Sequence, residues 1–313
     1  MEEKEYESIE QIDEDTDKLI SKYRIAYTTI LALLIRQIDE EMNDRQTKKL
    51  LKEVNLILVG LDEEAKVFLK SVFPQYYLFS LKNIDSLAIQ ISDVKKLSRA
   101  EHAIHKEALK RATNDLYNDL DKNTRYLSRE AKKIIRDNAQ SLITAMIEGG
   151  DSYITVKKKL REQLLANGIS SFKDAGSRVW KIDRYADMVI RTKSRILHNE
   201  GTLNRLKEYQ EKYAEEGAYS ENFDLIQISK HGAADWCRYY EDMVFSISGE
   251  SKNYPSIETL PNRPYNILHP GCKHIFLAYM SALMGKGETV NNKYQSLSMK
   301  ELNKIDYESL KKK

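Results

Sequence analysis

Histidine and cysteine, the side chains best suited to bind metals or act as nucleophiles, are concentrated in one part of this chain. The stretch HPGCKH (269–274) holds two histidines and one of only two cysteines among 313 residues. Thiolate and imidazole are preferred zinc ligands, and a structural zinc site needs four of them. Such a site would tie the long loop 249–268 to the strands around it. The candidate ligands are His231, Cys237, His269, Cys272 and His274.

Three other interpretations of the same residues stay open. The chain has no CxxC pair and no standard finger spacing, so cysteine could instead pack as a small apolar side chain among hydrogen-bonded histidines. A disulfide between Cys237 and Cys272 is disfavoured in a reducing cytoplasm but could form later, in an extracellular particle. An enzyme, a toxin or a DNA-processing protein would need a base within reach of the thiol and an oxyanion site, and the sequence indicates neither.

Composition limits the class of protein. Hydrophobic residues make up 41% of the chain and charged residues 31%, which is enough for real cores. The formal net charge is only +2, so any nucleic-acid contact must come from a local patch. No apolar stretch approaches the roughly 20 residues that span a bilayer, and no secretory signal is evident. We therefore expect no membrane contact and folding in a reducing cytoplasm.

Helical periodicity dominates the first two-thirds of the sequence. Apolar residues recur at intervals of three and four over about 16–48 and again over 54–68, where a helix should end near Pro74. Ser98 and Glu101 have the spacing of a capping box and predict a new helix start. Further helices are expected over about 128–148, 152–166 and 182–216, the first two stopped by glycine.

The periodicity changes near Gly217. Three short segments rich in strand-forming residues follow, at 223–229, 243–248 and 274–279. We expect a mainly α protein with a small C-terminal β unit (α+β), in which long N-terminal helices precede an antiparallel hairpin or three-stranded sheet. The first 17 positions hold nine acidic residues against one lysine. The expected division is an acidic flexible arm (1–17), a helical domain (18–178), a C-terminal domain (179–284) and a polar basic tail (285–313).

Basic residues gather in the helical middle of the chain. Residues 157–207 contain thirteen Lys or Arg against five Asp or Glu. Contacts from this stretch to phosphates would be independent of base sequence and sensitive to salt. The alternative is an ordinary solvated helix face. The candidate DNA-binding residues are Lys157, Lys158, Lys159, Arg161, Arg178, Arg184, Arg191, Lys193 and Arg195.

Three stretches resemble the C-terminal signature of the Mu F-like family of tailed-phage minor capsid, or head morphogenesis, proteins. They are VIRTKSRILHNEG (189–201), KHGAADWCRYYEDMVFSISG (230–249) and YPSIETLPNRPYNILHPGCKH (254–274). The matching positions are Arg191, Thr192, Asn199, Gly201, Cys237, Val244, Phe245, Ser246, Gly249, Pro255, His269, Pro270, Cys272 and His274. The chain departs from the family at Asp242-Met243 (usually Gly-Lys), Gly271 (usually Asn) and Lys193 (commonly Glu).

The resemblance covers about residues 180–280 and implies a few-copy structural component of the virion, with no enzyme activity and no catalytic residues. The implied partners are the portal protein, a major capsid or scaffolding protein, and packaged double-stranded DNA bound non-specifically. The implied location is the capsid interior near the portal, after assembly in the host cytoplasm. In that setting HPGCKH would shape a docking loop, with or without zinc.

Overall fold

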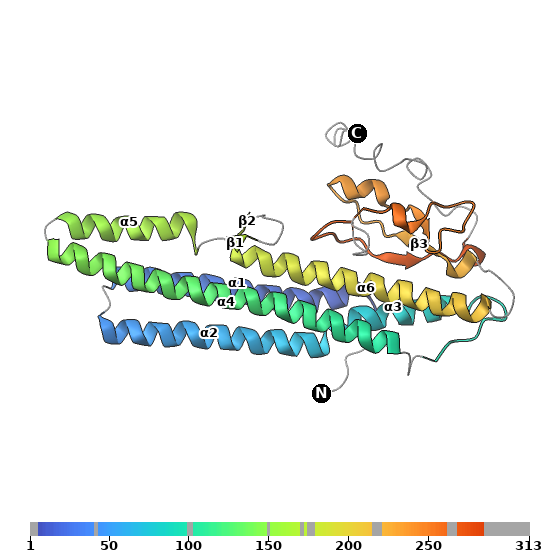
Figure 1. Cartoon of the computed structure of the whole chain (residues 1–313), viewed down its shortest axis with the longest axis horizontal. Coiled ribbons are helices and arrows are strands. Elements are labelled where there is room, and N and C mark those ends of the chain that lie inside the picture. Colours follow the sequence, from blue (N-terminus) through green and yellow to red (C-terminus); the bar gives the residue numbers. More distant parts are fainter. Residues whose placement is uncertain are drawn as a thin grey trace. The chain divides into compact units, whose positions relative to one another are not determined.

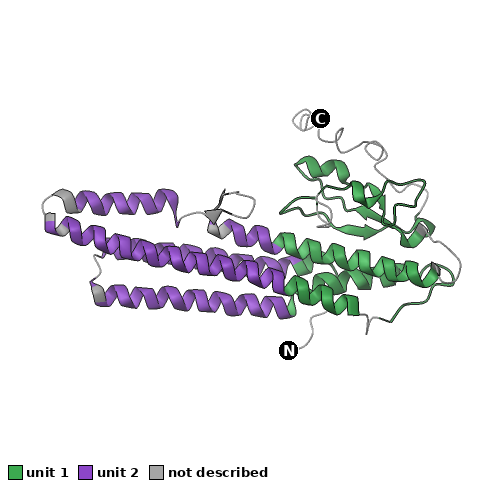
Figure 2. Ribbon diagram, in the orientation of Figure 1, with its two compact units in different colours: residues 1–12, 71–113, 191–313 green, residues 13–70, 114–190 purple. Residues whose placement is uncertain are grey.

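The computed structural model describes residues 6–40, 43–98, 103–148, 151–169, 172–173, 179–214, 221–261 and 268–284. These residues are mainly helical with a small antiparallel sheet near the C-terminal end, so the expected α+β class is confirmed. The chain divides into two compact units (Figure 2). Unit 1 comprises residues 1–12, 71–113 and 191–313, and unit 2 comprises residues 13–70 and 114–190. The four-part division expected from the sequence stays a prediction, and its tail (285–313) lies outside the described residues.

Six helices account for most of the described chain (Figure 1). They are α1 (Ile9–Asp39), α2 (Asp44–Ser71), α3 (Phe73–Ala88), α4 (Ala103–Glu148), α5 (Asp151–Asn167) and α6 (Ile182–Ala214). Pro74 does separate two helices as predicted, since α2 ends at Ser71 and Pro74 lies in the first turn of α3. None of the described helices combines the length and apolar composition that crossing a bilayer requires.

Helix α1 begins within the segment expected to be a flexible acidic arm. Ser8 and Gln11 form a reciprocal capping box, in which each side chain accepts the other residue's backbone N–H at 3.3 Å. Ile12 and Thr16 are buried, at 0% and 1% exposure. Acidic side chains in the first turn also suit the positive end of a helix dipole. Residues 9–17 are therefore helical, because a cap and a buried face outweigh the acidic composition.

The helix predicted over 16–48 is in fact two helices. Asn43 and Gln46 form a second capping box, with both hydrogen bonds at 3.0 Å, and this box starts α2. Apolar periodicity continues across the break and does not reveal it. The Asn-x-x-Gln spacing of the capping box was the sequence pattern that marked the start of α2. Conversely, α4 is one continuous helix of 46 residues, because neither glycine nor proline interrupts it. Residues 99–102, including Glu101 of the predicted capping box, lie outside the described residues.

An apolar core between helices stabilises unit 2. Tyr27 of α1 also accepts the backbone N–H of Ile169 at 3.1 Å, which fixes the chain just after α5. Two short strands of this unit, β1 (Phe172–Lys173) and β2 (Val179–Trp180), pair antiparallel. The core residues come from α1, α2, α4, α5 and the segment just after α5. They are Ile30, Leu34, Ile38, Leu50, Val54, Leu58, Leu127, Ala131, Ile135, Leu164 and Ile169.

Unit 1 packs a three-stranded sheet against α3 and α6. The predicted strands are confirmed as β3 (Leu225–Ile228), β4 (Val244–Ser246) and β5 (Phe276–Ala278), with β3 central and both neighbours antiparallel to it. Ile226 and Ile228 enter the main core beside residues of α3 and α6, whereas Leu225 joins a second cluster with Val244 and Tyr279. Both faces of β3 are therefore covered, which explains its nearly continuous apolar sequence.

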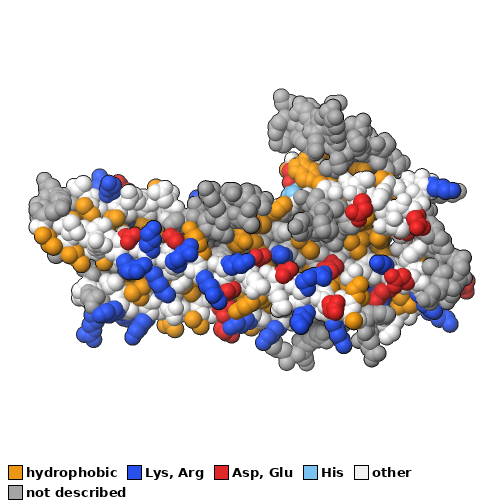
Figure 3. Space-filling view, in the orientation of Figure 1, with side chains coloured by type: hydrophobic (Ala, Val, Ile, Leu, Met, Phe, Trp, Pro, Cys, Tyr) orange, Lys and Arg blue, Asp and Glu red, His pale blue; other side chains and the backbone are white. Residues whose placement is uncertain are grey.

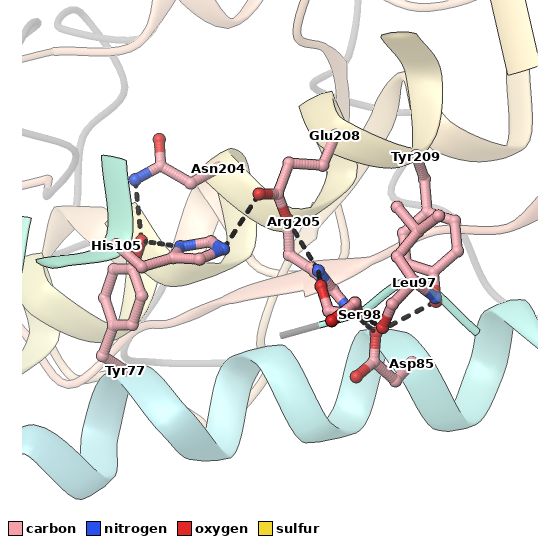
Figure 4. A network of polar contacts seen from close by, with 9 residues as sticks. All are labelled: Tyr77, Asp85, Leu97, Ser98, His105, Asn204, Arg205, Glu208 and Tyr209. Atoms are coloured by element: carbon pink, nitrogen blue, oxygen red, sulfur yellow. Dashed lines mark hydrogen bonds and ion pairs between the residues drawn. The ribbon is translucent and has the colours of Figure 1, made fainter. Parts of the chain in front are cut away.

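A buried arginine crosslinks the elements of unit 1 (Figure 4). Arg205 of α6 has no exposed side-chain surface, and its guanidinium contacts Asp85 of α3 at 2.7 Å and Glu208 at 2.8 Å. The same group donates to the carbonyl oxygens of Leu97 at 2.8 Å and Ser98 at 3.4 Å. A planar guanidinium with five donors is suited to such a junction. Arg205 thus joins α3, α6 and the segment after α3.

The network continues to the first turns of α4 (Figure 4). The Nε2 atom of His105 lies 2.9 Å from Glu208 Oε1, and its Nδ1 atom lies 2.7 Å from the Tyr77 hydroxyl. Asn204 in turn donates to that hydroxyl at 2.9 Å. Burial raises the pKa of Tyr77 to about 12. The phenol is therefore neutral at physiological pH and can act as both donor and acceptor in this chain.

Helix α6 also approaches α3 closely at Gly201. A Cβ atom at this position would overlap the Ser80 hydroxyl oxygen and lie 3.1 Å from the Tyr77 backbone oxygen. Glycine is required there by space, since the backbone of α3 cannot move aside as a flexible side chain can. Gly60 of α2 is also helical, but a Cβ atom there would meet nothing within 4 Å.

We predict that Arg205→Met destabilises unit 1 by about 3–5 kcal/mol, because it leaves the Asp85 and Glu208 carboxylates without their buried partner. Urea unfolding followed by circular dichroism measures this loss. The matched control is Arg111→Met, which breaks the pair with Glu200 at an arginine whose side chain is 61% exposed. That variant should lose less than about 1 kcal/mol. Equal losses in the two variants would contradict the role given to burial.

The two glycines give a second prediction. Gly201→Ala should lower the free energy of unfolding by about 1–3 kcal/mol through overpacking, despite the better helix propensity of alanine. Gly60→Ala should raise it by about 0.5–1 kcal/mol, because the position is exposed and open. Denaturant titration of both variants compares the signs. A stabilised Gly201→Ala protein would show that α3 and α6 are not in close contact.

Candidate metal centre

Cys237 lies at the start of a short 3-10 helix, Trp236–Tyr240, between β3 and β4. Asp235 caps this helix, since its Oδ1 atom accepts the backbone N–H of Cys237 at 3.1 Å. The Cys237 thiol donates to the same oxygen at 2.6 Å. Cys237 is only 2% exposed. The cap therefore fixes the side chain toward the interior of unit 1.

The HPGCKH stretch forms a tight turn that leads into β5. The backbone N–H of Cys272 donates to the carbonyl of His269 at 3.1 Å. Gly271 adopts φ +79°, a conformation open to glycine, and its N–H donates to Thr192 of α6 at 2.8 Å. Cys272 and His274 are each 2% exposed. The turn thus directs both side chains inward.

The five predicted ligands come together as two adjoining groups. Cys237, His269 and Cys272 present ligand atoms that all lie within 4.8 Å of one another. His231 and His274 form the second group with Glu241, again within 4.8 Å. Glu241 was not among the sequence candidates, because a carboxylate in a charged loop carries no distinguishing pattern.

His274 connects the two groups. Its Nδ1 atom lies 3.1 Å from the Cys272 sulfur, and its Nε2 atom lies 3.3 Å from Glu241 Oε1. The same carboxylate oxygen accepts the backbone N–H groups of Ala233 at 2.8 Å and His231 at 3.1 Å. Burial acts to raise the pKa of Glu241, but these two N–H groups and His274 together lower it. Glu241 is therefore an ionised anchor for the His274 ring.

His269 is oriented by its own turn. Its Nδ1 atom lies 3.0 Å from the Pro270 carbonyl oxygen, so this nitrogen carries the proton and donates. Its Nε2 atom is shielded from solvent and makes no hydrogen bond within the described part of the chain, although Asp235 Oδ2 lies 3.2 Å away. The arrangement places this ring nitrogen beside two sulfurs.

The electrostatics of the cluster favour one thiolate. The neighbouring Cys237 side chain, followed by His269 and His274, lowers the pKa of Cys272. The bond to Cys272 and burial both raise the pKa of Cys237. The interaction with Cys272 raises the pKa of His269 to about 9. Cys272 is thus the acceptor on which the neighbouring groups converge, as expected for a metal ligand or for a buried ion pair with imidazolium.

The motif residues on α6 hold the turn and β5 in place. Thr192 accepts from Gly271, as described, and Asn199 accepts the backbone N–H of Phe276 at 2.8 Å. Asn199 is completely buried. Gly201 gives α6 its close approach to α3. Three positions that match the Mu F-like signature therefore have structural roles on one helix: two hold the turn and β5, and one packs against α3.

Two departures from the signature lie in left-handed backbone conformations. Asp242, where glycine is usual, has φ +63°, and Gly271, where asparagine is usual, has φ +79°. Asp, Asn and Gly are the residues that adopt this left-handed region most readily. The substitutions are therefore conservative for the chain path even though their side chains differ.

The nine basic candidates have different environments. Lys158, Lys159, Arg161 and Arg184 are exposed, whereas Lys157, Arg191 and Lys193 are partly buried. Lys157 donates to the Asp39 carbonyl at 2.8 Å, and Arg161 lies 3.4 Å from the Asp39 carboxylate. Arg195 is only 8% exposed and lies over the Tyr76 ring. Arg178 lies outside the described residues.

A family described as Phage minor capsid protein 2 has a sequence model that matches residues 9–313 of this chain. No curated protein and no solved structure matches it. The family match includes the helical N-terminal half, which the resemblance to the Mu F-like signature did not cover. The chain therefore belongs to the phage minor capsid protein 2 family and is a structural component of a phage virion.

Proposed function

We propose that this protein is a few-copy, Mu F-like head morphogenesis protein that binds the portal on the inner side of the capsid. The observation that carries the proposal is the family match over residues 9–313. The major capsid or scaffolding protein would be its second partner during assembly in the host cytoplasm. The Mu F-like part of the proposal draws support from three motif residues of α6: Thr192 binds the turn, Asn199 binds β5, and Gly201 lets α6 approach α3.

We propose a structural rather than an enzymatic role for the Cys/His cluster. Cys272 does lie beside histidines, as a Cys–His nucleophile would require. Reactive cysteines, however, need access to their substrate, and both Cys237 and Cys272 are 2% exposed. Cys237 lies in the 3-10 helix capped by Asp235, and Cys272 lies in the turn that Thr192 of α6 binds through Gly271. These elements shape the part of unit 1 around the cluster. The alternative, a toxin or DNA-processing enzyme, has no such support.

Contact with packaged DNA is the finer part of the proposal. On the face shown in Figure 3, the charged side chains on the helices of unit 2 are mostly Lys and Arg. The side chain of Lys158 on α5 is 76% exposed, and Lys159 beside it is also exposed. Phosphates would meet these side chains without base recognition. Such binding suits a protein that lies beside a densely packed genome.

We predict that the protein enters proheads only when the portal protein of the same phage is present. Proheads assembled with and without portal protein can be purified by gradient sedimentation and analysed by quantitative mass spectrometry. The expected result is a copy number far below that of the major capsid protein, and a signal at background without portal. Equal incorporation in the two preparations would refute the portal contact while leaving the role in the head intact.

We predict salt-sensitive binding to duplex DNA of any sequence. Lys158→Glu/Lys159→Glu should weaken binding and reduce the slope of log K against log salt by about 2, one unit for each lost phosphate contact. Fluorescence anisotropy between 50 and 200 mM salt, common conditions for such titrations, measures this slope. The control with equal charge change is Lys106→Glu/Lys110→Glu on α4. Equal weakening by both pairs would indicate a general charge effect and no defined DNA face.

A further inference from the structure

We propose that Cys237, His269, Cys272 and His274 bind one zinc ion through two sulfurs and two ring nitrogens. The inference rests on the side-chain geometry of unit 1 and does not depend on where the protein sits in the virion.

Three of the four ligand atoms lie close together, and the fourth, on His274, lies beside one of them. With Zn–S of about 2.3 Å and Zn–N of about 2.0–2.1 Å, tetrahedral ligand atoms lie about 3.3–3.8 Å apart. The Cys272 sulfur and His274 Nδ1 are 3.1 Å apart, and the ligand atoms of Cys237, His269 and Cys272 all lie within 4.8 Å of one another. Zinc binding would therefore draw Cys237, His269 and the His274 ring toward a common centre beside Cys272.

Each histidine is prepared to bind metal by the group on its other nitrogen. Zinc-bound histidines usually donate their second ring N–H to a carbonyl or a carboxylate, which fixes both tautomer and orientation. His269 Nδ1 donates to the Pro270 carbonyl, and His274 Nε2 faces Glu241. The nitrogens that would face the ion are then His269 Nε2, which lies 3.2 Å from Asp235 Oδ2, and His274 Nδ1 beside Cys272.

The neighbouring group of His231, Glu241 and His274 fits a metal less well. Glu241 Oε1 already accepts two backbone N–H groups and faces His274 Nε2. The His231 side chain is 32% exposed and lies 4.0 Å from Glu241. The group also lacks the thiolates that zinc prefers in structural sites. We therefore assign Glu241 the task of orienting His274, and place His231 outside the site.

Zinc binding at these residues is balanced by proton release. Two protons leave to solvent when both sulfurs become thiolates and both rings are neutral. One comes from the Cys237 thiol, which donates to Asp235 in the structure, and the other comes from the Cys272–His269 pair. Two thiolates and two neutral imidazoles then neutralise the 2+ charge of zinc. Asp235 keeps its hydrogen bond to the Cys237 backbone N–H. The rest of its carboxylate can face solvent, because the side chain is 52% exposed.

The site would fasten two segments that are distant in the sequence. Cys237 belongs to the 3-10 helix before β4, and the other ligands belong to the turn before β5. Closing a loop of this length by a metal removes conformational freedom from the unfolded chain. The bound ion would thus hold the loop 249–268 against the sheet and protect the C-terminal part of unit 1 from proteases.

The test is zinc content and cobalt spectroscopy of the full chain, purified under reducing conditions. We expect about one equivalent of zinc by elemental analysis. After exchange, Co²⁺ should give the visible bands of a tetrahedral site and the near-ultraviolet charge-transfer band of thiolate ligation. Cys272→Ser should lose the metal, and Glu241→Gln should bind it about 10–100-fold more weakly. His231→Gln is the matched control and should keep full occupancy and the same spectrum.

Two outcomes would overturn the proposal. One is a reduced wild-type protein that neither contains zinc nor acquires the cobalt spectrum. The other is metal that is lost in His231→Gln but retained in Cys272→Ser, which would move the ion to the neighbouring group. Should Cys272→Ser fail to fold, the wild-type protein still decides the matter. Chelation must increase cleavage within 221–284 and added zinc must reverse it; unchanged cleavage after complete chelation refutes a structural ion.

Discussion

Arg205 carries a full charge into the interior of unit 1, where none of its side chain meets solvent. A buried cation is tolerated only if carboxylates and carbonyl oxygens surround it, and Asp85, Glu208, Leu97 and Ser98 supply these groups. The four partners lie on three stretches of chain, so satisfying one guanidinium requires α3, α6 and the segment after α3 to meet at one point. The sheet packs on α3 and α6, so its position depends on that junction.

Helix α6 carries this constraint to the Cys/His cluster. One part of the helix holds Arg205, and the preceding turns hold Thr192, Asn199 and Gly201. These residues meet the HPGCKH turn, β5 and α3, respectively. The turn is therefore positioned by a helix that is itself fixed by a buried charge. Residues that looked like a signature of function are, in this structure, the connections that give the cluster a defined shape.

The geometry of the Cys/His cluster depends on the candidate ligands and also on the neighbouring groups that hydrogen-bond to them. Pro270 and Glu241 determine which nitrogen of each histidine is free, and Asp235 fixes Cys237. Without these partners the same five histidines and cysteines would have no preferred geometry. The backbone participates as well, since left-handed conformations at Asp242 and Gly271 shape the turns on either side. A virion protein that must survive outside the cell gains from such a preset arrangement.

The sequence by itself determined the elements that depend on local patterns. Apolar periodicity located α5, α6 and the three strands, and Pro74 marked the break between α2 and α3. It also singled out the histidines and cysteines and the resemblance to phage minor capsid proteins. Local patterns were insufficient where two signals competed. Acidic composition concealed the start of α1, and continuous periodicity concealed the break at Asn43, although capping boxes marked both positions. Only the tertiary structure decided that Glu241 orients His274, that Arg195 is buried, and that the candidate ligands form two groups. These facts depend on contacts between residues far apart in the chain, and no local spacing encodes such contacts.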